Sequence, residues 1–154
     1  MADAAITKVE TYVAGLLANY APLVGQNIIV DRSPEEPMQI EEMPAILVVV
    51  SSHIPGMSEE QNMTRHEAVF EFLAFSGPQS GMVINHENQR ILAHIAGAIA
   101  QDRTMGGRCE SFEESAIDTE LSKDIHAASL SYEVRFYTQR DNYFQIVGDG
   151  GMIF

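Results

Sequence analysis

The chain has little that would point to an oxidising compartment or a membrane. A single cysteine, Cys109, excludes an intrachain disulfide, so a reducing compartment is the simpler expectation. No apolar run approaches the roughly 20 residues that span a bilayer, and the longest, residues 45–50, has the length of a strand. The N-terminus also lacks the basic segment of a signal peptide. We therefore expect a soluble cytoplasmic protein with no membrane partner.

Positive charge is scarce as well. Nine lysine and arginine residues stand against 22 aspartate and glutamate residues, which gives a formal net charge of −13. The nine cations are spread along the sequence and form no basic stripe. Such a chain repels nucleic acid and anionic membranes at long range. We therefore expect no specific DNA binding. The 154 residues, 45% of them apolar, suffice for one domain with a substantial core.

Motifs for metal binding or nucleophilic catalysis are missing. The histidines form neither an HxH nor an HExxH pattern, so no zinc motif is present. We expect solvent-facing or capping roles for His53, His66, His86, His94 and His126. Arg108 could lower the pKa of the neighbouring Cys109, but no histidine is close in sequence, and packing is the simpler interpretation.

The remaining candidates for chemistry also have the wrong spacing. No nucleophile elbow surrounds Ser51, Ser52 and His53. The pair Gly106 and Gly107 follows a helix, whereas phosphate-binding glycine loops precede one, so it favours a left-handed turn. The side chains of adjacent glutamates in the sequence are expected to point in different directions, which indicates a solvated surface. We expect no catalytic residue, no metal and no cofactor.

Apolar periodicity predicts two helices. In the first, apolar side chains recur every three or four residues, and residues 22–25 end it; the stripe comprises Ile6, Val9, Val13, Leu16, Leu17 and Tyr20. In the second, Asn85 is the expected N-cap, residues 102–107 form the stop, and the buried stripe comprises Ile91, Leu92, Ile95 and Ile99.

Apolar runs and alternation predict five strands, at residues 27–31, 45–50, 65–75, 108–118 and 128–138. The last is the cleanest, and its inward side chains are expected to be Ala128, Leu130, Tyr132, Val134 and Phe136. Residues 33–43 and 51–64 are expected loops, and the second is long enough to be functional. The order α-β-β-β-α-β-β favours an α+β fold with a mostly antiparallel or mixed sheet and both helices on one face.

The C-terminal residues form an expected extension, residues 142–154, to a domain of residues 1–141. Residues 148–151 are glycine-rich and predict a flexible hinge that carries the apolar side chains Met152, Ile153 and Phe154. A frayed terminus is one interpretation. A contact with a neighbouring subunit is the other.

The arrangement resembles the tail terminator family of long-tailed bacteriophages, whose members are also described as minor tail or tail completion proteins. Four features carry the resemblance. An amphipathic helix precedes a proline-led apolar strand at residues 43–49, and a charged strand at residues 65–75 precedes the long helix. That helix ends in an Asp-x-x-x-Gly-Gly turn at residues 102–107, and a late alternating strand ends in an aromatic residue, threonine and an acidic residue within 136–141.

The resemblance implies a structural virion protein rather than an enzyme. Six copies would form a ring at the head–tail junction. The ring would end polymerisation of the tail tube and offer a surface for head joining, and it would be assembled in the host cytoplasm. The implied partners are other copies, the tail tube protein and a head–tail connector or stopper protein, with DNA passing nearby. We expect contacts through two apolar or acidic segments, with the side chains Met57, Glu59, Glu60, Met63, Met152, Ile153 and Phe154.

Three alternatives stay open. A connector or stopper protein of the same neck has the same chemistry and different neighbours. An acidic regulatory domain that binds proteins belongs to another class. A small enzyme is the least favoured alternative, because no site is evident in the sequence.

Overall fold

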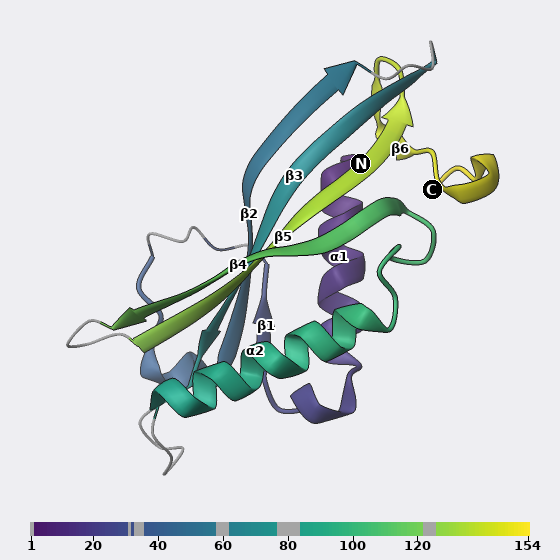
Figure 1. Cartoon of the computed structure of the whole chain (residues 1–154). Coiled ribbons are helices and arrows are strands. Elements are labelled where there is room, and N and C mark those ends of the chain that lie inside the picture. Colours follow the sequence, from purple (N-terminus) through teal and green to yellow (C-terminus); the bar gives the residue numbers. More distant parts are fainter. Residues whose placement is uncertain (1, 31, 33–35, 58–61, 77–83, 122–125) are drawn as a thin grey trace.

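The computed structural model describes residues 2–30, 32, 36–57, 62–76, 84–121 and 126–154. Two helices and a six-stranded, mixed and strongly curled sheet make an α+β fold, as Figure 1 shows. The predicted fold class is confirmed. The helices are α1 (Ala5–Ala18) and α2 (Ile84–Ala100). The strands are β1 (Asn27–Ile29), β2 (Ala45–Met57), β3 (Met63–Phe75), β4 (Cys109–Leu121), β5 (His126–Gln139) and β6 (Asn142–Ile146).

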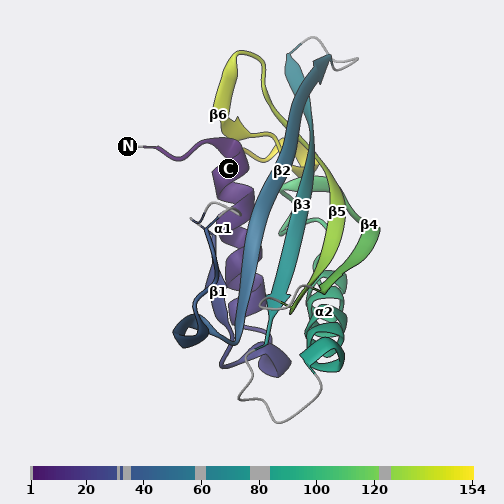
Figure 2. The same cartoon turned by 90° about the vertical axis from the view of Figure 1, so that its left-hand side faces the viewer.

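The sheet has the strand order β1-β2-β3-β5-β4, and β6 pairs with the end of β5. Only β1 and β2 run parallel; the other neighbours are antiparallel. Figure 2 shows β2, β3, β5 and β4 side by side, with α1 and α2 behind them. Consecutive strands pair at the β2–β3 and β4–β5 hairpins, while the β3–β5 pairing joins the two halves around α2.

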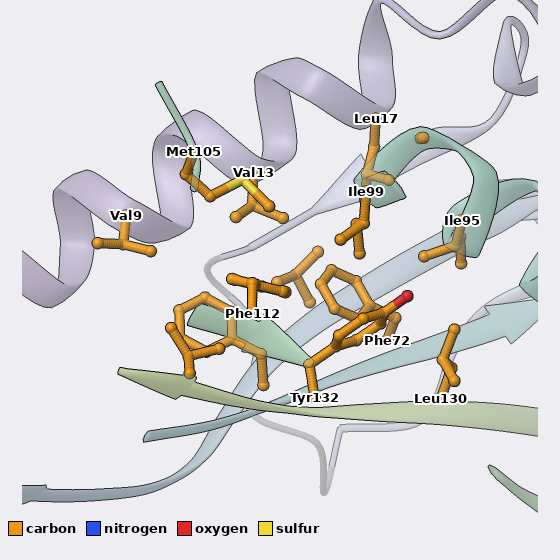
Figure 3. Close-up of a cluster of buried hydrophobic side chains, with 14 of the residues drawn as sticks. Val9, Val13, Leu17, Phe72, Ile95, Ile99, Met105, Phe112, Leu130 and Tyr132 are labelled. Atoms are coloured by element: carbon orange, nitrogen blue, oxygen red, sulfur yellow. The ribbon is translucent and has the colours of Figure 1, made fainter. Parts of the chain in front are cut away.

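One face of the sheet packs on both helices and forms the main core. The predicted inward side chains of β5 are all buried, and so are Ala68, Phe70, Phe72 and Ala74 on β3. From the helices, Val9, Val13 and Leu17 and the predicted α2 stripe are buried as well. Figure 3 shows Phe72, Phe112 and Tyr132 facing the helix side chains. Alternation on the strands and the helical repeat therefore meet in a single apolar layer.

Strand β2 begins with a run that is apolar on both sides, because each side of it is covered. Ile46 and Val48 belong to the main core. Ala45 and Leu47 point to the other face, where they join a smaller cluster with Met38. A strand buried on both faces reads as a continuous apolar run, as expected for these residues.

The expected loop at residues 51–64 is wrong for residues 51–57 and 63–64, which are strand, and residues 58–61 lie outside the described residues. Strand β2 continues to Met57, β3 begins at Met63, and the two pair along their whole length after a bulge between Val50 and Ser52. Pro55 and Gly56 predicted a turn, but Pro55 lies on a part of β2 that β1 no longer flanks. Proline is tolerated on such an edge because no ladder hydrogen bond is lost there.

The turn after α2 is left-handed, as the two glycines predict. Gly106 and Gly107 have φ values of 68° and 85°, and Met105, also at positive φ, is buried beneath them. The carboxylate of Asp102 accepts a hydrogen bond from the Gly106 amide at 2.9 Å and another from the Tyr12 hydroxyl. The turn thereby ties α2 to α1. Asn85, in contrast, lies in the first turn of α2, which begins at Ile84, and is not the N-cap.

Candidate interaction surfaces

The C-terminal segment folds back on its own chain, so the predicted flexible hinge is wrong. Ile146 and Phe154 exchange both backbone hydrogen bonds, at 3.2 and 3.0 Å. Between them, Val147 pairs with Ile153 and the Gly148 amide donates to the Met152 carbonyl at 2.7 Å. Figure 1 shows the yellow end of the chain beside β6. We call residues 146–154 the C-terminal clasp.

The ring of Phe154 packs against residues of its own chain. The Arg108 guanidinium lies 4.3 Å from the centre of that ring and 4.5 Å from the centre of the Tyr12 ring. Lys8 donates to the Phe154 carbonyl at 3.3 Å and also to the Phe144 carbonyl. These contacts hold the terminus against α1. The packing of a cation on aromatic faces stabilises this arrangement.

Gly148 makes this close approach possible. A Cβ atom at this position would lie 2.4 Å from the Gly107 carbonyl oxygen and 2.5 Å from the Phe154 ring. Contacts that short do not occur for a real side chain, so the backbone of the clasp would have to move. A glycine is therefore required where the clasp crosses the turn after α2.

We expect Gly148→Ala to open the clasp. The substitution should lower the free energy of unfolding by about 1 kcal/mol. This is the low end for overpacking, because the clasp can move away and so relieve the clash. Hydrogen exchange should speed up at the Ile146 and Phe154 amides. The matched control is Gly15→Ala on α1, where a Cβ meets nothing within 4 Å and alanine favours a helix by up to about 1 kcal/mol. Unchanged exchange at both amides in Gly148→Ala would contradict the prediction.

The apolar side chains that remain exposed at this end form a second feature, which we call the C-terminal tip. It comprises Tyr143, Phe144, Met152 and Ile153, which are 43%, 52%, 60% and 48% exposed. Of the predicted contact residues, Met152 and Ile153 thus present their side chains to solvent, whereas Phe154 is half-buried. Their role as a contact stays a prediction.

The β2–β3 hairpin carries the other predicted contact residues. Met57 ends β2, and Glu59 and Glu60 lie outside the described residues. Met63 is half-buried at the start of β3, opposite Gln139. It lines a groove of about 350 Å³ together with Arg108, Tyr137 and the backbone of the clasp. The structure therefore brings Met63 close to the C-terminal segment, a proximity that the sequence spacing does not reveal.

His66 is buried, which corrects the expectation of a solvent-facing or capping role for this residue. His66 has no exposed surface; its Nδ1 lies 2.8 Å from His53 Nε2, and its Nε2 lies 2.9 Å from the Thr138 hydroxyl. The ring stacks on Phe136 at 4.7 Å and meets the edge of Tyr143 at 4.6 Å. The alternation of β3 offered a signal, since residue 66 falls on the inward side with residues 68, 70, 72 and 74.

Burial controls the protonation of this pair. It lowers the pKa of His66 to about 4, and the neighbouring His53 adds to that effect. Burial also lowers the pKa of His53. Near neutral pH both rings are therefore neutral, and the contacts between them and Thr138 are hydrogen bonds between neutral groups. In the described part of the chain, no group of three or more His, Cys, Asp and Glu side chains is arranged to hold a metal ion.

Cys109 is buried, which confirms the packing interpretation. Burial raises the pKa of its thiol to about 12 and outweighs the opposite effect of Arg108. A thiol with this pKa is protonated and weakly nucleophilic at neutral pH. The guanidinium of Arg108 instead packs on the rings of Tyr12 and Phe154.

The sheet has two long free edges. Among the described residues, β1 pairs with β2 only at residues 45–47, and nothing pairs with the outer side of β4. Figure 2 shows β2 and β4 on opposite flanks. Each carries an exposed isoleucine, Ile54 on β2 and Ile117 on β4, and both are 62% exposed. Free strand edges with exposed apolar residues are surfaces that proteins normally cover.

The sheet face opposite the helices is acidic over β3, β4 and β5. A groove of about 480 Å³ there is lined by Glu67, Glu110, Glu113 and Glu133 around the single Arg135. Arg135 donates to Glu67 at 3.2 Å. The remaining carboxylates give this face a net negative charge.

Comparisons with known proteins add no assignment. No protein-family model matches the chain, and no curated protein matches its sequence. Within the described residues, none of the helices has the length and apolar character needed to cross a membrane.

Proposed function

We propose that this protein is a structural subunit that joins copies of itself into a ring, caps the tail tube of a long-tailed bacteriophage and offers a surface for head joining. The observation that carries the proposal is the pair of free sheet edges on β2 and β4. A closed ring of identical subunits covers such edges without leaving any unpaired, whereas a monomer exposes them to aggregation.

The resemblance to tail terminators supports the second half of the proposal. The features that carry it are the amphipathic helix, the proline-led β2, the charged β3 before α2, the glycine turn and the end of β5. In the proposed ring, six copies meet the tail tube protein on one side and a connector or stopper protein on the other. No enzymatic step belongs to this role.

The charge suits a part through which DNA passes. With a formal charge of −13 for each copy, a ring presents a strongly negative surface. Carboxylates such as Glu110, Glu113 and Glu133 on the open sheet face would keep DNA from adhering if that face lines the channel. The orientation of this face toward the channel is part of the proposal.

We test capping by adding the purified protein to the tail tube protein of the same virus while it polymerises. Tube lengths are measured in electron micrographs. Capping predicts shorter tubes with an added ring at one end, in proportion to the protein supplied. Heat-unfolded protein at the same concentration is the control. Tubes of unchanged length without end density would contradict the proposal.

A further inference from the structure

We propose that the contact between His53 and His66 makes the position of β6 sensitive to acid. While the two rings carry at most one extra proton between them, they hold β6, and with it half of the C-terminal tip, against the sheet; a second proton releases β6. The inference goes beyond the proposed function, because it concerns how this end of the molecule responds to acid. It is tested separately from tail capping.

The two rings lie where four strands meet, at the end of the sheet where β6 pairs with β5 (Figure 1). His53 belongs to β2 and His66 to β3, and their rings are in hydrogen-bond contact. Thr138 of β5 contacts the other nitrogen of His66, and the Tyr143 ring of β6 packs against it nearly at a right angle. His66 has no exposed surface, whereas His53 is exposed. Water therefore reaches His66 only after one of these neighbours moves.

Two imidazole rings at this distance can share one extra proton but cannot hold two. In the neutral pair, one of the facing nitrogens, His53 Nε2 and His66 Nδ1, donates a hydrogen bond and the other accepts it. One extra proton leaves this bond intact, because the charged ring can donate to the neutral one. With a second proton from solvent, two N–H groups and two positive charges face each other at 2.8 Å. The doubly protonated pair therefore requires the site to open.

The surrounding groups do not offset a second proton. The rings and hydroxyl that contact His66 from β5 and β6 carry no negative charge: Phe136, Thr138 and Tyr143. Charged residues of β3 and β5 beside this site lie on the opposite face of the sheet, where they pair with one another: Arg65, Glu67 and Arg135. From α1, Lys8 donates to the Phe144 carbonyl and adds a positive charge. Burial accordingly lowers the pKa of His66 to about 4, and the neighbouring His53 adds to this effect.

Among the strands around His66, β6 is held most weakly. It has five residues and pairs with β5 at two positions of the register, whereas β2 and β3 pair along their whole length. Segments held by few hydrogen bonds and little buried area open at the lowest cost in free energy. Opening of the site therefore lifts β6, admits water to His66 and moves Tyr143 and Phe144, the two members of the C-terminal tip that β6 carries.

The test is amide hydrogen exchange of the full chain, followed by NMR at pH 7.5 and pH 5.5 and corrected for the intrinsic exchange rate. Val147 directly follows β6, and its amide donates to the Tyr137 carbonyl of β5 at 2.8 Å, so its exchange reports release of β6. The amide of Ile95, buried in α2, reports opening of the whole domain. As the pH falls through 6.5, a His66 ring in contact with water takes up a proton that the closed site excludes. We expect the protection of Val147 to fall about tenfold and to stay below that of Ile95 at both pH values.

A variant separates His66 from the other groups that titrate. His66→Gln keeps a neutral polar side chain in the site and takes up no proton, so the protection of Val147 should become independent of pH over this range. The matched control is His86→Gln, which removes an exposed histidine from α2 and should retain the tenfold fall. An equal fall in His66→Gln and the wild type would overturn the proposal.

Two results from the wild type alone would also overturn it. Equal protection of Val147 and Ile95 at both pH values would mean that β6 opens only when the whole domain unfolds. An NMR titration in which the His66 ring gains its proton near pH 6.5 would mean that the closed site accepts the charge. These wild-type measurements decide the question even if His66→Gln does not fold. None of them decides tail capping, which is read from tube length.

Discussion

Phe112→Ala is expected to lower the free energy of unfolding by about 3 to 5 kcal/mol, the usual cost of removing a fully buried phenylalanine. The centre of the Phe112 ring lies 5.1 Å from the ring centre of Tyr132, 5.5 Å from that of Phe70 and 6.4 Å from that of Phe72. It is buried beneath both helices, so its loss leaves a cavity that neighbouring strands cannot fill without moving. Urea denaturation at neutral pH measures the change.

The effect should be large because few side chains anchor β4. Cys109 and Phe112 are its buried residues among those whose side chains are described, and residues 113–118 are exposed. The matched control is Phe144→Ala, which removes the same ring from a side chain that is 52% exposed and should cost about 0.5 kcal/mol or less. Equal losses for the two variants would show that the aromatic layer does not hold β4 on the core.

The second expected result is a loss of stability in mild acid that comes from His66. Between about pH 7.5 and pH 5 the wild type should lose about 2 kcal/mol more free energy of unfolding than His66→Gln. Burial lowers the pKa of His66 to about 4 from the ordinary value of 6.5. As the pH falls through 6.5 the unfolded chain takes up a proton that the folded chain cannot accept, which favours unfolding. The contribution is present above pH 6.5 and is lost toward pH 4.

Comparing the two proteins separates His66 from the carboxylates. Ion pairs with arginines lower the pKa values of Glu42, Glu87 and Glu114, so their contributions are present at neutral pH and also decrease in acid. These losses are common to both proteins and cancel in the difference. Urea unfolding at several pH values gives the measurement. Parallel pH profiles for the wild type and His66→Gln would contradict a buried neutral histidine.

Local sequence patterns predicted the parts of the fold that depend on one element at a time. The helical repeat identified the buried stripe of α2, and alternation identified the inward side chains of β3 and β5. The order of the elements then indicated one sheet with both helices on one face, which the structure shows. These patterns exist because a helix and a strand each turn one side toward the core.

Features that depend on pairing between separate segments of the chain were missed. Residues 51–57 contain Ser51, Ser52, Pro55 and Gly56, which weaken the strand signal, yet pairing with β3 holds them in β2. The clasp forms through hydrogen bonds between Ile146 and Phe154 and the contact with Arg108, and no local pattern encodes these. Only the alternation of β3 could have identified His66 as buried.

The candidate surfaces divide in the same way. Met152 and Ile153 stand out in the sequence as apolar residues that follow the glycine-rich residues 148–151, and their side chains are exposed. A groove of about 430 Å³ between α2 and β4, in contrast, is lined by residues of two separate elements, among them Leu92 and Ile117. A groove of this kind depends on how two elements pack, so residue spacing alone does not predict it.

The measurement that tests tail capping most directly is electron microscopy of virus particles assembled without this protein. A capping ring predicts tail tubes of excessive and variable length that are not attached to heads. Tails of normal length beside full, detached heads would contradict capping and indicate a connector or stopper protein. Normal, infectious particles would contradict a structural role in the virion and favour an acidic regulatory protein.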